Sequence, residues 1–191
     1  MRTLIGVTGG SGAAFAVDFI RRCPGEKYLA FSRWGKYVLR QETDLVPADL
    51  AGDVDQILAD HDLSQRFSSG TNALDAMVII PCSSTTLGKI AAGIGDTFIT
   101  RAAAVTLKER RKLILVLRET PLSTIHLEAA AKVSAAGALV MPLCPPFYFR
   151  PDSVADVVTG FVDHLLAQVG VKAEREWNMD APVDIDESKD L

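Results

Sequence analysis

The segment TLIGVTGGSGAAFAVDFIRR (residues 3–22) runs through a strand, a glycine turn and a helix without a break. Residues 3–8 are a short apolar run rich in β-branched side chains, and residues 12–22 carry apolar side chains at helical spacing. Gly9, Gly10 and Gly12 lie at the junction, where small residues allow a tight turn. This segment predicts a fold in which strands alternate with helices.

The rest of the chain repeats this alternation. We expect further strands at 28–32, 77–82, 113–117 and 138–143, and helices at 33–42, 84–92, 97–110 and 121–136. The strands are continuous apolar runs, which is typical of strands buried on both faces. The sequence therefore predicts an α/β fold with a parallel sheet between two layers of helices.

The last predicted helix has the clearest boundaries. Asp152 is a plausible N-cap after Pro151, an apolar stripe follows, and Gly170 is a plausible C-cap. We expect residues 1–170 to form one domain. Residues 171–191 are polar and acidic, which favours an arm on a neighbouring molecule or a disordered tail. Only residues 44–66 have the composition of a linker.

Composition excludes several classes of protein. The chain has 191 residues, 48% hydrophobic, and a formal net charge of −4, which argues against nucleic acid as the main partner. Its three cysteines form no C-x-x-C pair, which favours a reducing cytoplasm over a disulfide framework. No apolar run is long enough to cross a membrane, and no cluster has the spacing of metal ligands.

Two segments that follow strands could bind an anion at the start of a helix. In VTGGSGAA (7–14), the glycines let backbone N–H groups approach a phosphate, and Ser11 adds a hydroxyl. In PCSSTTLGKIAAG (81–93), four hydroxyls at positions 83–86 exceed what one N-cap needs. The alternatives are a purely structural turn and a solvated cap. We expect Cys82 to be a buried filler rather than a nucleophile.

The stretch RAAAVTLKERRKLILVLRETP (101–121) concentrates basic residues in an acidic chain. Arg101 and Lys108 are seven residues apart, so a helix places them on one face. Arg110, Arg111 and Lys112 are expected to form a solvated helix end, where cations complement the helix dipole. Arg118 and Glu119 follow a buried strand, where they form either a structural ion pair or part of a site.

An aromatic segment, PPFYFRP (145–151), follows the strand predicted at 138–143. Tyr148 lies between two phenylalanines and could present its hydroxyl to a ligand. The alternative is an aromatic plug under a loop.

Taken together, these segments resemble the UbiX-type flavin prenyltransferases, once described as aromatic acid decarboxylases. The resemblance covers about residues 3–170 in the same order. It is carried by GVTGGSGAAFA (6–16), FSRWGKYVL (31–39), SSGT (68–71), PCSSTTLGKIAAGI (81–94), DTFITRAAAVTLKERRKLILVLRETPL (96–122), AGALVMPLCPPFYFRP (136–151) and the closing helix.

The resemblance implies a flavodoxin-like, Rossmann-like three-layer fold and the cofactor FMN. It implies an enzyme that joins a dimethylallyl group from dimethylallyl monophosphate to N5 and C6 of reduced FMN, without a metal. The product, prenylated FMN, would serve a UbiD-type decarboxylase. It also implies a dodecamer with flavin sites at subunit interfaces.

The resemblance also implies roles for individual residues. The catalytic positions are Glu119, Ser11 and Glu42, the last by a looser alignment. The positions matching the flavin site are Gly9, Gly10, Ser11, Ser32, Ser83, Thr86 and Arg118. Those around the prenyl phosphate are Arg101, Lys108, Arg118, Tyr148 and, at the position of an arginine in the last helix, His164.

This chain departs from the family pattern at two positions. His164 replaces an arginine that contacts the prenyl phosphate, and a histidine is a weaker, titratable substitute. It could face the site or be an exposed helix residue. Asn72 stands where an aromatic residue commonly follows the turn at 69–71, and an aromatic face could stabilise an allyl cation.

Two other functions remain open from the sequence. A flavin-dependent peptidyl-cysteine decarboxylase of related fold would use a catalytic histidine in its first helix, and residues 12–22 contain none. The second is a flavin-binding carrier without transferase activity, since both departures fall at the expected prenyl site.

Overall fold

The computed structural model describes residues 1–172, which form a six-stranded sheet in the order β3-β2-β1-β4-β5-β6. All neighbouring strands are parallel. The strands are β1 (Arg2–Val7), β2 (Glu26–Phe31), β3 (Gln56–Ala59), β4 (Ala76–Cys82), β5 (Lys112–Leu117) and β6 (Leu139–Pro142). This confirms the predicted parallel α/β fold.

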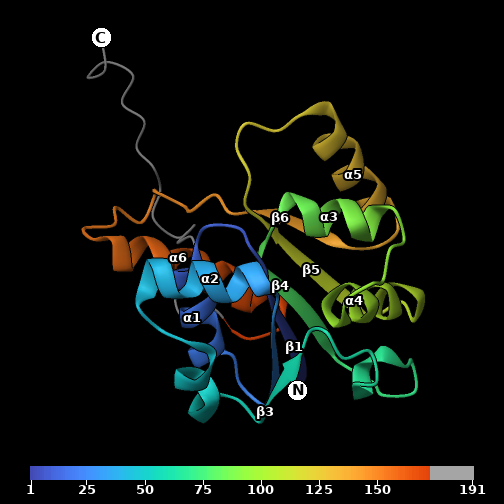
Figure 1. Cartoon of the computed structure of the whole chain (residues 1–191). Helices are drawn as coiled ribbons and strands as arrows, with labels where there is room; N and C mark the ends of the chain where they lie inside the picture. Colours follow the sequence, from blue (N-terminus) through green and yellow to red (C-terminus); the bar gives the residue numbers. More distant parts are fainter. Residues whose placement is uncertain (173–191) are drawn as a thin grey trace.

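Helices cover both faces of the sheet (Figure 1). They are α1 (Ala13–Arg22), α2 (Arg33–Thr43), α3 (Ser84–Ala91), α4 (Phe98–Lys108), α5 (Thr124–Ala135) and α6 (Val154–Gln168). One core joins α1, α2 and α6 to the sheet, and a second joins α3, α4 and α5. Successive β1 residues point into opposite cores, Leu4 into the second and Ile5 into the first, because strand side chains alternate.

The strand order fixes the position of the site. From β1 the chain moves outward to β2 and β3, then returns to place β4 on the other side of β1. Ligands of such sheets bind at the carboxyl ends of the strands, where this reversal leaves a crevice. The crevice here lies between the segments that follow β1 and β4, which are the two phosphate-binding candidates of the sequence.

Two elements differ from the sequence prediction. Residues 44–66 are no simple linker, because they contain a 3-10 helix (Pro47–Asp53) and β3. β3 has only four residues, too few to reveal an apolar pattern, although Leu58 is buried against β2. β6 was expected to be a buried strand, but it is the sheet edge and exposes Leu139.

Helix boundaries shift where a serine provides the cap. Ser123 caps α5, so this helix begins at Thr124 rather than at 121. The N-cap of α6 is Ser153, whose Oγ accepts a hydrogen bond from the Asp156 N–H at 3.1 Å, and not Asp152. Gly170 does end α6, with a φ of 90°, just after the C-cap Val169. The predicted C-terminal arm lies, beyond Lys172, outside the described residues.

Candidate active site

Thr8 joins the two loops of the central crevice. Its Oγ1 donates to the carbonyl of Pro81 and accepts from the N–H of Ser83, both at 2.8 Å. The turn after β1 and the turn after β4 therefore form one unit. The glycines pack closely within it: a Cβ on Gly9 would lie 2.7 Å from the Cβ of Trp34, and one on Gly10 would lie 3.3 Å from that of Pro81.

Glu42 occupies the N-terminus of α1. Its Oε2 accepts hydrogen bonds from the N–H groups of Gly12 and Ala13, at 2.8 and 2.7 Å. Burial opposes ionisation, but the hydrogen bonds from the Ser11 hydroxyl and these two N–H groups outweigh it and lower the pKa of Glu42. The anion at this helix end is thus the chain's own carboxylate, and phosphate binding at this turn stays a prediction.

The N-termini of α2 and α3 open onto a shared cavity of about 370 Å³. Ser32 Oγ caps α2 through the Gly35 N–H at 3.0 Å, and Ser83 Oγ caps α3 through the Thr86 N–H at 3.3 Å. The cavity lining also includes Gly9, Thr85 and the exposed indole of Trp34. Helix N-termini carry partial positive charge and free N–H groups, so this cavity can hold a phosphate.

Four of the expected flavin positions line this cavity: Gly9, Ser32, Ser83 and Thr86. Its three charged residues, Arg33, Asp60 and Lys89, were not predicted from the sequence. Arg33 follows the cap Ser32 directly, and Lys89 lies one helical turn beyond Thr85, which is the signal that could have indicated them. Gly10, Ser11 and Arg118 lie on the adjoining loops, where the Arg118 Cβ would be 3.6 Å from a Cβ on Gly10.

Glu119 faces α3. The Ser84 hydroxyl hydrogen-bonds its carboxylate, and the Thr120 N–H donates to Oε1 at 3.0 Å; in that order these bonds lower the pKa of Glu119. Among the ion pairs of residues 1–172, Arg118 does not pair with Glu119, although its charge adds a smaller stabilisation of the carboxylate. Glu119 is therefore an ionised group beside the crevice. It is held by the Ser84 hydroxyl, which is free for this role because Ser83 caps α3.

Cys82 is buried at the end of β4, as expected. Burial raises the pKa of its thiol to about 12. A thiol in that state is not a nucleophile at neutral pH, so Cys82 is a filler.

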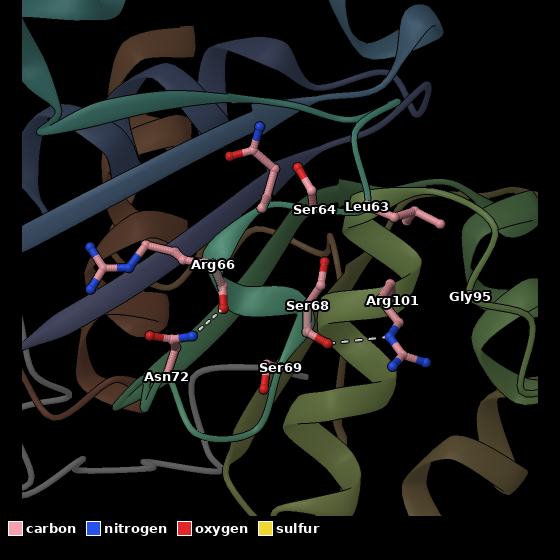
Figure 2. Close-up of a pocket in the computed structure, with 9 residues that line it drawn as sticks. Leu63, Ser64, Arg66, Ser68, Ser69, Asn72, Gly95 and Arg101 are labelled. Atoms are coloured by element: carbon pink, nitrogen blue, oxygen red, sulfur yellow. Dashed lines mark hydrogen bonds between the residues drawn. The ribbon is translucent and has the colours of Figure 1, made fainter.

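Arg101 lines a second cavity, of about 470 Å³ (Figure 2). Arg101 Nε donates to the Ser68 carbonyl at 3.3 Å, and a Cβ on Gly70 would lie 2.9 Å from Lys108 Nζ. Both cations of α4 thus approach the turn at 68–72, as expected of residues on one helical face. In the structure, Lys108 pairs with Glu109.

The turn at 68–72 is held by two polar side chains. Asn72 Nδ2 donates to the Arg66 carbonyl at 2.6 Å, so this departure from the family pattern fixes the loop (Figure 2). Arg111 Nη2 donates to the Gly70 carbonyl at 2.7 Å. The prediction of a solvated helix end for 110–112 is therefore wrong for Arg111. Lys112 is exposed, as predicted, but it begins β5 instead of ending a helix, and it donates to the Gln168 carbonyl.

Tyr148 and His164 lie elsewhere in the chain. Tyr148 is half-exposed and its ring contacts Phe149, with centroids 4.3 Å apart. His164 is exposed on α6 and lines a third cavity, of about 300 Å³, together with Cys144 and Met141 at the β6 edge. Within one copy, the expected prenyl-phosphate residues therefore lie in separate places, with Arg101 lining one cavity and His164 another.

Comparison with known proteins identifies the family. Residues 1–167 match the family model described as Flavoprotein. The flavin prenyltransferase UbiX of Thermoplasma acidophilum is 46% identical over 172 residues, covering 90% of this chain and 96% of that protein. The mitochondrial flavin prenyltransferase PAD1 of Saccharomyces cerevisiae is 38% identical, covering 91% of this chain and 73% of that protein.

The chain belongs to the UbiX-type flavin prenyltransferases. Solved structures agree. A crystal structure of AnUbiX (PadA1) in complex with FMN and dimethylallyl pyrophosphate has a TM-score of 0.90 and 36% identity, covering 93% of this chain and 97% of the other. A dodecameric FMN-dependent UbiX-like decarboxylase from Escherichia coli O157:H7 has a TM-score of 0.90 and 39% identity, covering 93% and 99%.

The peptidyl-cysteine decarboxylases are more distant from this flavin prenyltransferase. EpiD is 18% identical with a TM-score of 0.58, which shows a shared fold alone. Within residues 1–172, no helix is both long and apolar enough to span a membrane, and no cluster of three His, Cys, Asp or Glu side chains could hold a metal ion.

Proposed function

We propose that this chain transfers a dimethylallyl group from dimethylallyl monophosphate to N5 and C6 of reduced FMN. The family membership supports the reaction, and the relative solved with FMN and a dimethylallyl donor supports the two substrates. One observation on this chain supports the proposal most directly: a single cavity beside the glycine turn is lined by Ser32, Ser83 and Thr86.

The cavity fits FMN in its chemistry. Two helix N-termini and the cations Arg33 and Lys89 suit a phosphate. The Asp60 carboxylate also lines the cavity, but it is engaged by the Ile99 N–H, and the Trp34 indole offers an apolar surface. The glycine turn brings backbone close to α2 and β4, leaving no room for a side chain at Gly9. In the proposed site, Ser32, Ser83 and Thr86 hold the phosphate end, and Gly10, Ser11 and Arg118 lie beside the ring.

The prenyl donor needs cations for its leaving phosphate. Arg101, Lys108 and Arg118 supply positive charge, and the Tyr148 hydroxyl supplies a hydrogen bond. His164 takes the position of the family arginine. Lys108 pairs with Glu109 in the structure. When the donor binds, the Lys108 ammonium group leaves the Glu109 carboxylate and pairs with the donor phosphate.

Glu119 has the properties of a proton acceptor. Bonding of N5 of reduced FMN to the allyl carbon would break that carbon's bond to the phosphate, and closing the new ring would add a proton to the allyl double bond while C6 loses its proton. With its pKa lowered, the Glu119 carboxylate is ionised at neutral pH and can accept a proton at Oε. Hydrogen bonds also lower the pKa of Glu42, so this carboxylate is ionised at neutral pH, and one of these bonds positions the Ser11 hydroxyl.

We also propose that the chain is a dodecamer whose transferase site combines residues from neighbouring copies. A related UbiX-like protein is dodecameric, and the expected donor-binding residues lie in separate cavities of one copy. Residues 1–170 would form the single flavin-binding domain. The product would pass to a UbiD-type decarboxylase in the cytoplasm, where the free thiols of Cys23, Cys82 and Cys144 are stable.

The experiment compares the native protein with Glu119→Gln under anaerobic conditions. Both should bind FMN, because Glu119 lies outside the α2–α3 cavity. With reduced FMN and dimethylallyl monophosphate, the native protein should form a prenylated flavin, and turnover by Glu119→Gln should fall by about a hundredfold or more. Equal, negligible turnover by both proteins would instead indicate a flavin carrier.

A further inference from the structure

The helix N-termini around the crevice are not equivalent. That of α1 is filled by the Glu42 carboxylate. That of α4 is filled by Asp60, whose Oδ1 accepts from the Ile99 N–H at 2.9 Å and whose carbonyl accepts from the Phe98 N–H at 2.8 Å. In the part of the chain that the structure describes, α2 and α3 receive only the hydroxyls of their own N-cap serines. An incoming phosphate therefore meets its least-satisfied donors between α2 and α3.

Lys89 lies on the wall of that same cavity. It is on α3, on the same helical face as Thr85 and Thr86, and all three line the cavity with Ser32 and Ser83. Its Nζ pairs with Asp96 Oδ2 at 2.7 Å. The Asp96 side chain is half-exposed and the Lys89 side chain one-third exposed, so the pair is accessible to solvent and weakly held.

We propose that Lys89 is a ligand of the FMN phosphate and that Asp96 is its counter-ion in the flavin-free protein. This inference rests on the FMN site of the proposed function. The phosphate dianion displaces Asp96 from the ammonium group, because it offers more charge and the added donors of two helix N-termini. Asp96 thus lowers the apparent affinity for FMN by competing for Lys89, while Arg33, which also lines the cavity, is exposed.

The test measures dissociation constants of oxidised FMN and of riboflavin, which lacks the phosphate, by equilibrium dialysis. Lys89→Met should weaken FMN about tenfold, the worth of one charge-assisted hydrogen bond, and leave riboflavin unchanged. Asp96→Asn should tighten FMN about threefold, as expected for releasing an exposed ion pair. In the Lys89→Met background, Asp96→Asn should have no effect on FMN.

The matched control is Lys132→Met, which removes an exposed lysine from α5, away from the cavity. It should leave both dissociation constants unchanged. Unchanged riboflavin binding also shows that Lys89→Met keeps the cavity folded. Equal FMN affinity in Lys89→Met and native protein, equal weakening of both flavins, or no tightening by Asp96→Asn would overturn the proposal. No prenyl donor is present, so failure of the transferase reaction would not affect these results.

Discussion

Glu42 has a role in the fold that the sequence did not indicate, and its catalytic role stays a prediction. The resemblance implied a catalytic carboxylate, and the structure shows a carboxylate that caps α1 through two backbone N–H groups. A charged cap of this kind contributes about 1 kcal/mol to the free energy of unfolding. The same hydrogen bonds fix the Ser11 loop beside the crevice.

Glu42→Gln should make the pH dependence of stability shallower. The pKa of Glu42 is lowered in the folded protein, so its charge stabilises the fold above its ordinary pKa of 4.5. That contribution is lost as the pH falls through the lower folded value. Urea unfolding should therefore show the variant less stable by about 1 kcal/mol at pH 7, with the gap closing below pH 4. A gap that is constant with pH would contradict a role for the charge.

Ser84→Ala tests the environment of Glu119. Removing the hydroxyl that contributes most to its lowered pKa should raise that pKa toward 4.5. The acidic limb of kcat/KM should therefore move to higher pH than in the native protein. Titration of the donor phosphate affects both proteins equally, so it does not contribute to this difference. Ser134→Ala, which removes an exposed hydroxyl from α5, is the control. If the acidic limb of kcat/KM falls at the same pH in Ser84→Ala and in the native protein, Ser84 does not influence the proton transfer.

Ser32, Ser83 and Thr86 could be predicted directly from the sequence, whereas Lys89 is indicated only by its helical spacing from Thr85. Ser32 and Ser83 follow strands directly, and Thr86 lies in the first turn of the helix after β4, so strand topology brings all three to one edge. Lys89 lies within a helix whose register becomes visible only once the cap at Ser83 is known. Arg111 was assigned to solvent because its partners, the carbonyls of Gly70 and Asn72, lie about forty residues away in the chain.

At the scale of elements, an ion pair joins α1 to α6. Arg22 contacts Asp163, which is almost fully buried, and also Asp18 at 3.0 Å. Asp163 Oδ2 has no hydrogen-bond partner in the structure. The Arg22 guanidinium is therefore the main compensation for a buried carboxylate.

Arg22→Ala should lower the free energy of unfolding by about 3 kcal/mol, since it leaves a buried charge without its partner. Asp163→Asn in that background removes the charge and should recover part of the loss. Chemical denaturation of the two variants measures both effects. If the double variant is no more stable than Arg22→Ala, the cost comes from lost packing of the arginine stem instead.

Long elements could be predicted and short or capped ones could not. The central strands β1, β4 and β5 are buried on both faces and produce unmistakable apolar runs. β3 has only four residues and β6 lies at an exposed edge. The sequence pattern of each strand therefore does not indicate where that strand lies in the sheet. The α5 and α6 starts were misplaced because several polar residues compete for each cap position.

At the scale of the whole molecule, the proposal requires residues from more than one copy. His164→Arg restores the family cation at the β6 edge, and should lower KM for the donor severalfold without changing FMN affinity, because His164 and the FMN cavity lie apart in each copy. Steady-state kinetics with varied donor and saturating FMN measures this. An unchanged KM would place His164 outside the transferase site.

The central claim is that this chain attaches a prenyl group to flavin. The most direct measurement is the mass of the flavin released after anaerobic incubation of the protein with reduced FMN and deuterium-labelled dimethylallyl monophosphate. We predict a flavin heavier by one labelled dimethylallyl group, absent from Glu119→Gln. Recovery of unmodified FMN alone from the native protein, with either the monophosphate or the diphosphate as donor, would contradict the account.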